Sequence, residues 1–221
     1  MKKTVFSLIL TAFTGLSLLA GCAARTGGEP AGQTNRDEVV ISISSEPTTL
    51  DPCRGWGHGA TPLVQSTLVE YDYDMNFVND LAEEYALSSD GLTWTFTLRD
   101  GVKWYKSDGT EYADLKAQDF VDSMHYICDP AHDSKTFDIV SSAVKNAQKF
   151  YSGEITDPNE IGVRAVDEKT LEYTLEAPTP YFLSMLSYVC FMPVNGDFLA
   201  EVGDRFGTSA DTILYNGAYI C

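Results

Sequence analysis

Alternating hydrophobic and polar positions predict strands in several parts of the chain. Trp94, Phe96 and Leu98 alternate with threonines in the run LTWTFTL, the two-residue period of a strand with one buried face. Turn signals of the type SSDG and DG surround this run, so residues 80–112 are predicted to form a small antiparallel unit. Further strands are predicted at residues 38–44, 163–166, 170–175 and 214–221.

A helical spacing of apolar positions is clearest in the run LKAQDFVDSMHYIC. Its apolar residues recur every three or four positions, and Asp129-Pro130 ends the pattern, so residues 115–128 are predicted to form an amphipathic helix. Thr61 as a cap and Pro62 in the first helical position predict a helix over residues 61–71. Other helices are predicted at residues 141–151, 182–189 and 197–206.

Strands and helices are mixed without a regular β-α-β alternation. The predicted fold class is therefore α/β, in the mixed α+β sense. No internal repeat or low-complexity tract interrupts the part of the chain from residue 38 onward. That part is long enough for one sizeable domain or two small lobes.

The first residues have the pattern of an export signal. Two lysines precede a nearly uncharged apolar run, which ends at Leu19-Ala20-Gly21-Cys22. This tetrad resembles the bacterial lipobox, which implies cleavage after residue 21 and lipid chains on Cys22. Residues 1–21 are then a lipoprotein signal peptide and residues 22–37 a flexible tether. The alternative is a simple secreted protein that is cut near the Ala-Gly pair.

Charge and cysteine content narrow the functional classes. The formal net charge of −17 argues against nucleic acid and anionic lipid headgroups as partners, because phosphate binding needs a basic patch. The cysteines after Cys22 have no zinc-site spacing, and Cys128 and Cys190 lie in apolar runs typical of buried small side chains. The sequence also contains no G-x-S-x-G, H-E-x-x-H or Walker A motif, so it gives little support to an enzyme.

The run EPTTLDPCRGWGHGA at residues 46–60 gathers unusual chemistry in a short loop. A thiol, a guanidinium, an indole and an imidazole stand among three alternating glycines. Neither a packed strand nor a packed helix favours such glycines, whereas close approach of a backbone to a ligand uses them. Cys53 and His58 could each bind a metal, but no paired ligand spacing accompanies them.

Seven motifs, in order, resemble the solute-binding protein family 5 components of peptide and nickel ABC importers. They are EPTTLDP, LVEY, DLAEEYALSSDGLTWTFTLRDGVKW, DGTEYADLKAQDFVDSMHYICDP, IGVRAVDEKTLEYTLEAPTPYF, PVNGDFLAEVGDRFG and ILYNGAY. They run from about residue 38 to residue 219. The central and C-terminal motifs look most like the oligopeptide-binding lipoproteins of Gram-positive bacteria, whereas PCRGWGHG is similar to members assigned to nickel or dipeptide import.

The resemblance implies a periplasmic-binding-protein-like type II fold with two lobes that close over a ligand. Residues 38–68 and 178–221 would form the first lobe, and residues 69–177 an inserted second lobe. Family members are more than twice this length, and a larger lobe follows where this chain ends. We therefore expect the 221-residue chain to be an N-terminal fragment with weak ligand affinity and exposed apolar faces.

The resemblance also implies a function and a set of contacts. The expected function is the lipid-anchored substrate-binding component of an oligopeptide ABC importer on the extracellular face of the membrane, or in the periplasm of a Gram-negative cell. No catalysis, cofactor or nucleic acid is expected; the partners are an oligopeptide and the ABC permease subunits, and the protein is expected to be a monomer. One alternative is that the same scaffold binds a nickel complex or another small solute. A further alternative is that the protein is a secreted hydrolase. The ligand-binding candidates are Trp56, Gly57, His58, Phe137, Asn216, Gly217 and Tyr219.

The nickel alternative makes a direct prediction for His58. If the imidazole is a metal ligand, His58→Ala abolishes nickel binding, measured by calorimetry with nickel and free histidine, and leaves the circular dichroism spectrum unchanged. Nickel binding that survives this substitution would remove the metal role of His58.

Overall fold

The computed structural model describes residues 38–42, 47–55 and 61–221. The described residues from 47 onward belong to one compact unit, and residues 38–42 belong to a separate one. The strand predicted at residues 38–44 is wrong over the described residues 38–42, where the backbone is irregular and Val40 is 84% exposed. Alternation alone does not make a strand, because a strand also needs a partner for its N–H and C=O groups.

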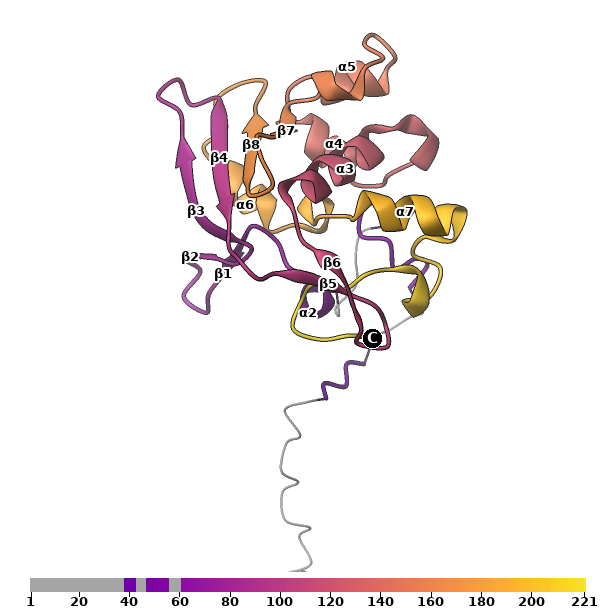
Figure 1. Cartoon of the computed structure of the whole chain (residues 1–221). Helices are drawn as coiled ribbons and strands as arrows, with labels where there is room; N and C mark the ends of the chain where they lie inside the picture. Colours follow the sequence, from indigo (N-terminus) through magenta and orange to yellow (C-terminus); the bar gives the residue numbers. More distant parts are fainter. Residues whose placement is uncertain (1–37, 43–46, 56–60) are drawn as a thin grey trace, which may run out of the picture. The chain divides into compact units, whose positions relative to one another are not determined.

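A four-stranded antiparallel sheet forms one layer of the compact unit (Figure 1). Its strand order is β3 (Ala82–Leu87), β4 (Thr93–Leu98), β8 (Thr170–Thr174) and β7 (Val163–Ala165). The alternation in β4 is confirmed, because Trp94, Phe96 and Leu98 are buried while the threonines between them are partly exposed. The hairpin predicted at residues 163–175 is also confirmed, as β7 pairs with β8.

Helix α3 (Ala117–Cys128) covers the buried face of this sheet and contacts β7 and β8. It confirms the helix predicted at residues 115–128, and the apolar positions of the predicted stripe are all buried. The core between the two layers is a chain of aromatic rings, with centroids 6.3 Å apart for Phe96 and Tyr173 and 5.6 Å apart for Tyr173 and Phe182. Burial of such rings contributes strongly to the stability of a core.

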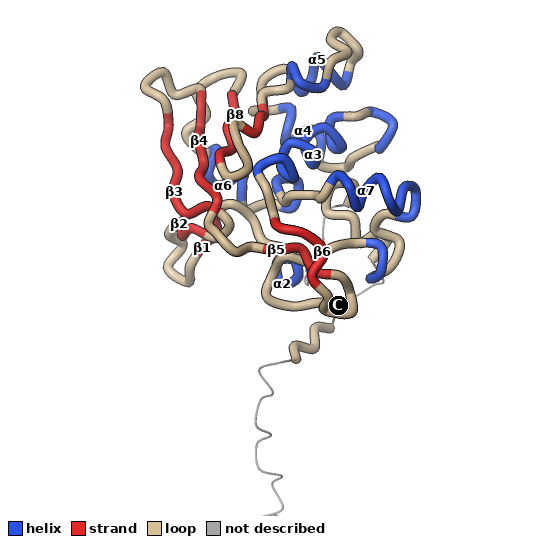
Figure 2. The backbone as a smooth tube through the Cα atoms, viewed as in Figure 1, coloured by secondary structure: helices blue, strands red, loops and turns tan. Residues whose placement is uncertain are grey.

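Two small hairpins and short helices complete the described fold (Figure 2). The hairpins are β1 (Val69–Tyr71) with β2 (Phe77–Asn79), and β5 (Lys103–Tyr105) with β6 (Glu111–Asp114). The remaining helices are α2 (Thr61–Val64), α4 (Phe137–Ser141), α5 (Ala147–Tyr151), α6 (Phe182–Leu186), α7 (Gly196–Val202), and the 3₁₀ turns Pro130–His132, Pro158–Glu160, Val189–Phe191, Gly203–Arg205 and Ala210–Thr212.

The helix predicted over residues 61–71 is wrong beyond its first turn. Only α2 is helical, and residues 69–71 form β1 instead. Distant side chains take the N–H groups that would continue the helix. The amide of Ser66 donates to Asn216 Oδ1 at 3.0 Å, and that of Thr67 donates to Asp80 Oδ2 at 3.1 Å. These tertiary hydrogen bonds override the local helical pattern.

The helix predicted over residues 141–151 forms only over its last part, as α5; Ser141 is the last residue of α4, and residues 142–146 are not helical. Val144 forms a β-bridge with Leu175, and the amide of Lys145 donates to the carbonyl of Thr174 at 3.0 Å. Asn146 then adopts a left-handed conformation with φ of 61°, which ends any helix that would pass through it. Backbone pairing with the C-terminal end of β8 thus replaces the middle of the predicted helix.

Toward the C-terminus the predicted helices are shorter than the pattern indicates. Residues 182–189 contain α6 and the start of a 3₁₀ turn, and residues 197–206 contain α7 and a second 3₁₀ turn. The strand predicted at residues 214–221 is wrong, because only an isolated bridge between Tyr215 and Tyr105 forms there.

The aromatic core predicts a large cost for truncating β4. Phe96→Ala removes a fully buried ring that contacts Tyr85, Trp94 and Tyr173, so the free energy of unfolding falls by about 3–5 kcal/mol in a urea titration. Thr95→Ala, on the opposite face of the same strand, is the matched control. An equal loss for the two variants would contradict the assignment of the buried face.

Candidate functional site

A buried carboxylate organises the segment that leads into the glycine-rich loop. Asp51 is 1% exposed, and its Oδ1 accepts hydrogen bonds from the amides of Cys53 at 2.8 Å and Arg54 at 3.2 Å. Its Oδ2 accepts a hydrogen bond from the hydroxyl of Tyr126 on α3, at 2.8 Å. Burial raises the pKa of Asp51, while these hydrogen bonds favour the charged form and oppose that shift. The LDPC turn is thereby fixed to α3.

Cys53, the thiol of this segment, is a packed core residue. It is 0% exposed, and its Sγ lies 3.4 Å from Ser123 Oγ, which donates to the carbonyl of Met192 at 2.7 Å. Burial raises the pKa of the Cys53 thiol well above its usual range, so the thiol stays protonated at neutral pH. Cys128 and Cys190 are likewise buried and unpaired, and burial raises the pKa of each to about 12. These cysteines act as small apolar side chains.

A hollow of about 320 Å³ opens beside this turn. Three segments far apart in the sequence line it, namely 48–55, 133–135 and 204–208. A smaller hollow of about 200 Å³ shares Arg54, Asp204 and Phe206 with it and adds the ring of Tyr126, which stacks on His132 with centroids 3.9 Å apart. Together they form a recess that we call the Arg54 hollow. Its lining residues are Thr48, Thr49, Arg54, Gly55, Asp133, Lys135, Asp204, Phe206, Gly207 and Thr208, with Tyr126, His132, Leu199 and Gly203 from the smaller part.

Backbone hydrogen bonds hold the walls of the Arg54 hollow together. The amide of Leu50 donates to the carbonyl of Gly207 at 2.8 Å, and the amide of Lys135 donates to the carbonyl of Arg54 at 3.1 Å. Gly207 has a φ of +72°, and a Cβ added there would lie 2.5 Å from the Cβ of Asp51. Only glycine allows the two walls to approach this closely.

Charges of both signs line the Arg54 hollow. Lys135 forms an ion pair with Asp133, whereas Arg54 is exposed and has no carboxylate within 4.0 Å in the described part of the chain. Asp204 contributes a further carboxylate. The hollow therefore offers a cationic partner for a ligand carboxylate and an anionic partner for a ligand ammonium group. Sequence reasoning missed Lys135 and Asp204, because no local pattern connects them with residues 48–55.

Three of the predicted ligand contacts lie on the C-terminal segment and pack against α2. The amide of Gly217 donates to the carbonyl of Val64 at 3.1 Å, and the amide of Tyr219 donates to that of Leu63 at 2.9 Å. Asn216 is 8% exposed and accepts the hydrogen bond from Ser66 described above. A Cβ at Gly217 would lie 2.6 Å from the backbone of Val64. These residues fix the segment to α2; their contact with a ligand stays a prediction.

The other predicted contacts differ in what the structure shows of them. Phe137 is 5% exposed and stacks on Tyr151 with ring centroids 4.0 Å apart, so most of its surface is used in packing α4 on α5. Its role as a ligand contact stays a prediction. Trp56, Gly57 and His58 lie outside the described residues.

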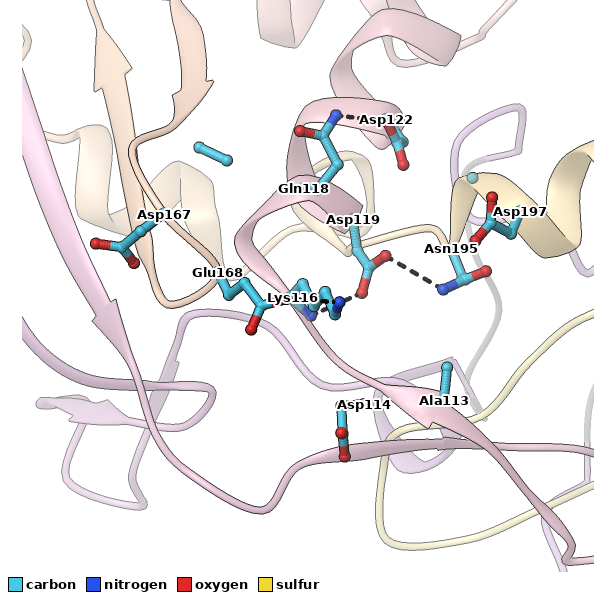
Figure 3. A pocket seen from close by; sticks show the side chains of 12 residues that line it. Ala113, Asp114, Lys116, Gln118, Asp119, Asp122, Asp167, Glu168, Asn195 and Asp197 are labelled. Atoms are coloured by element: carbon cyan, nitrogen blue, oxygen red, sulfur yellow. Dashed lines mark hydrogen bonds and ion pairs between the residues drawn. The ribbon is translucent and has the colours of Figure 1, made fainter.

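A larger hollow of about 740 Å³ lies at the N-terminal end of α3, and it is acidic (Figure 3). Asp119 is its central hydrogen-bonding residue. Its carboxylate accepts hydrogen bonds from Trp104 Nε1 at 2.8 Å, from the amide of Lys116 at 2.9 Å and from Asn195 Nδ2 at 3.3 Å. The carboxylate therefore joins β5, the start of α3 and the segment before α7. This is a structural role.

Two further findings concern metal binding and membrane-spanning helices. The described residues contain no group of three His, Cys, Asp or Glu side chains that could hold a metal ion. Among the same residues, no helix is long and apolar enough to cross a bilayer.

Comparison with known proteins identifies the family. The profile of the bacterial extracellular solute-binding proteins, family 5 Middle, matches residues 76–221. The chain therefore belongs to this family. It is 36% identical over its whole length to the oligopeptide-binding protein SarA of Streptococcus gordonii, and 39% identical to the oligopeptide-binding protein AliB of Streptococcus pneumoniae.

A solved structure gives the same result for the fold. The murein tripeptide-binding protein MppA of Escherichia coli superposes with a TM-score of 0.71 at 34% identity, over 80% of this chain and 34% of MppA. The predicted α/β class, on the scaffold of two-lobed periplasmic oligopeptide-binding proteins, is confirmed by this likeness. The chain spans about a third of the length of these relatives, 34% for SarA and 33% for AliB.

Asp119 generates a prediction for the pH dependence of stability. Burial raises its pKa from 3.8 to about 6, so the folded state binds a proton more tightly than the unfolded state between about pH 4 and pH 6. The free energy of unfolding of the wild type therefore falls as the pH rises from about 4 to about 6, because this carboxyl ionises less readily in the folded state than in the unfolded state. Asp119→Asn cannot ionise, so its free energy of unfolding rises relative to wild type by about 2–3 kcal/mol from pH 4 to pH 6.

Urea titrations at several pH values measure this difference. Asp197→Asn is the matched control, because Asp197 lines the same hollow but is exposed. A constant offset between Asp119→Asn and wild type across this pH range would show that the pKa of Asp119 is not raised.

Proposed function

We propose that this protein is the lipid-anchored extracellular substrate-binding component of an ABC transporter that imports oligopeptides. The anchor would be formed at Cys22, and the protein would act as a monomer without catalysis of its own. In a Gram-negative cell it would act in the periplasm. The observation that carries the proposal is the 36–39% identity to SarA and AliB over the whole chain, since both are named oligopeptide-binding proteins.

The chemistry of the Arg54 hollow supports a peptide as the ligand. A free peptide carries one carboxylate, one ammonium group and a backbone that both donates and accepts hydrogen bonds. The exposed guanidinium of Arg54 fits the carboxylate in a bidentate geometry, and Asp204 fits the ammonium group. Trp56, Gly57 and His58 follow Arg54 directly in the sequence, and we propose that they contribute contacts to the same ligand, with Asn216, Gly217, Tyr219 and Phe137 as further candidates.

Ligand capture would follow the closure of two lobes. Residues 38–68 and 178–221 would belong to the first lobe, and residues 69–177 to the second. A bound peptide stabilises the closed state by the difference between its affinities for the closed and open states. The closed, loaded protein is then the form that the permease receives.

The proposal predicts that Arg54 sets peptide affinity. Calorimetry on the protein expressed from its natural gene should give saturable heat with tri- to hexapeptides, and Arg54→Ala should weaken the binding by about ten- to a hundredfold through loss of a charge-assisted contact. Arg99→Ala is the matched control, because Arg99 pairs with Asp80 at 3.4 Å and does not line the hollow.

Three outcomes would count against the proposal. An equal loss for the two arginine variants would remove the assigned role of Arg54. Absence of heat with every peptide, together with saturable binding of nickel and free histidine, would replace the peptide by a metal complex. Cleavage of the peptides on long incubation, measured by mass spectrometry, would indicate a hydrolase.

A further inference from the structure

The smaller part of the Arg54 hollow differs in chemistry from the larger part. Its volume is about 200 Å³. Liquid water occupies about 30 Å³ per molecule, so this space suits one large side chain and not a longer stretch of ligand. We call it the aromatic pocket. Apart from Arg54 and Asp204, the described residues that line it are apolar or aromatic, namely Tyr126, His132, Leu199, Gly203 and Phe206.

Hydrogen bonds and ring contacts fix the walls of the aromatic pocket. The hydroxyl of Tyr126 donates to Asp51, and the ring of Tyr126 stacks on the imidazole of His132. His132 Nδ1 donates to the carbonyl of Tyr126 at 2.9 Å, and Phe206 meets the ring of Tyr126 edge to face with centroids 6.1 Å apart. Walls that are fixed before a ligand arrives lower the entropic cost of binding.

The charged residues of the aromatic pocket lie where it joins the larger part of the hollow, because Arg54 and Asp204 line both parts. A guanidinium binds a carboxylate through two parallel hydrogen bonds, and this geometry fixes the direction of the group behind the carboxylate. A contact between one carboxylate and an ammonium group imposes no such direction. The side chain next to a C-terminal carboxylate on Arg54 is therefore the one that is directed into the aromatic pocket.

We propose that the aromatic pocket binds the side chain of the peptide's C-terminal residue and selects a large apolar or aromatic one. A charged side chain would lose its water there, which is unfavourable. A phenyl ring instead buries apolar surface against Tyr126, Leu199 and Phe206. The inference rests on the proposed function, which assigns the peptide carboxylate to Arg54. It adds that the last side chain of the peptide sets the affinity.

Calorimetry with three peptides, on the protein expressed from its natural gene, tests the inference. Ala-Ala-Phe should bind about ten- to a hundredfold more tightly than Ala-Ala-Ala, which is the gain expected from burying one aromatic side chain. Phe-Ala-Ala carries the same ring at the other end and should bind like Ala-Ala-Ala.

Filling the pocket gives a second test. Leu199→Trp should weaken the binding of Ala-Ala-Phe at least about tenfold, because the indole occupies the space, and should leave the affinity for Ala-Ala-Ala within about twofold of wild type. Ala200→Trp is the matched control, because Ala200 is the next residue of α7 and is exposed outside the hollow. It should bind both peptides as wild type does.

Three outcomes would overturn the inference: equal affinities of the wild type for Ala-Ala-Phe and Ala-Ala-Ala, tighter binding of Phe-Ala-Ala than of Ala-Ala-Phe, or equal losses in the two tryptophan variants. In each of these cases a peptide still binds, so the proposed function stands. Absence of heat with all three peptides would instead remove the peptide ligand and the role of the pocket together.

Discussion

The structure of the candidate site depends on one buried carboxylate. Asp51 holds the turn formed by residues 51–54 and attaches that turn to Tyr126 in the last turn of α3. Because α3 also covers the sheet, the position of Arg54 is set by the packing of the whole unit. The close contact of Gly207 with Asp51 adds the third wall. A rigid set of walls lets the Arg54 hollow present its charges without reorganisation when a ligand arrives.

The most reliable predictions from the sequence concern elements whose hydrophobic pattern matches the burial of their faces in the packed structure. β4 and α3 are examples, since each buries one face against the other layer and no distant segment competes for its backbone hydrogen bonds. The errors at residues 61–71 and 141–151 have the opposite cause. Asn216 and Asp80 in the first case, and the C-terminal end of β8 in the second, take backbone groups that a helix would have used. Neither partner is visible in the local pattern.

The candidate site is only partly accessible to sequence reasoning for the same reason. The run around Cys53 and Arg54 is conspicuous, but the structure divides its residues between two roles. Cys53 is buried beside Ser123, whereas Arg54 faces the hollow. Lys135 and Asp204 join the site from segments about 80 and 150 residues away, a distance at which charge patterning along the chain carries no signal. The family resemblance, by contrast, is readable from motifs in register, and the family is confirmed over residues 76–221.

In the proposed function, the Arg54 hollow receives the peptide. A titration of the ¹⁵N-labelled protein with an unlabelled tripeptide, followed by backbone amide chemical shifts, tests it most directly. The largest changes are expected on residues 48–55, 133–135 and 204–208. Changes that centre instead on the acidic hollow around Asp119, or no changes at saturating peptide, would contradict it.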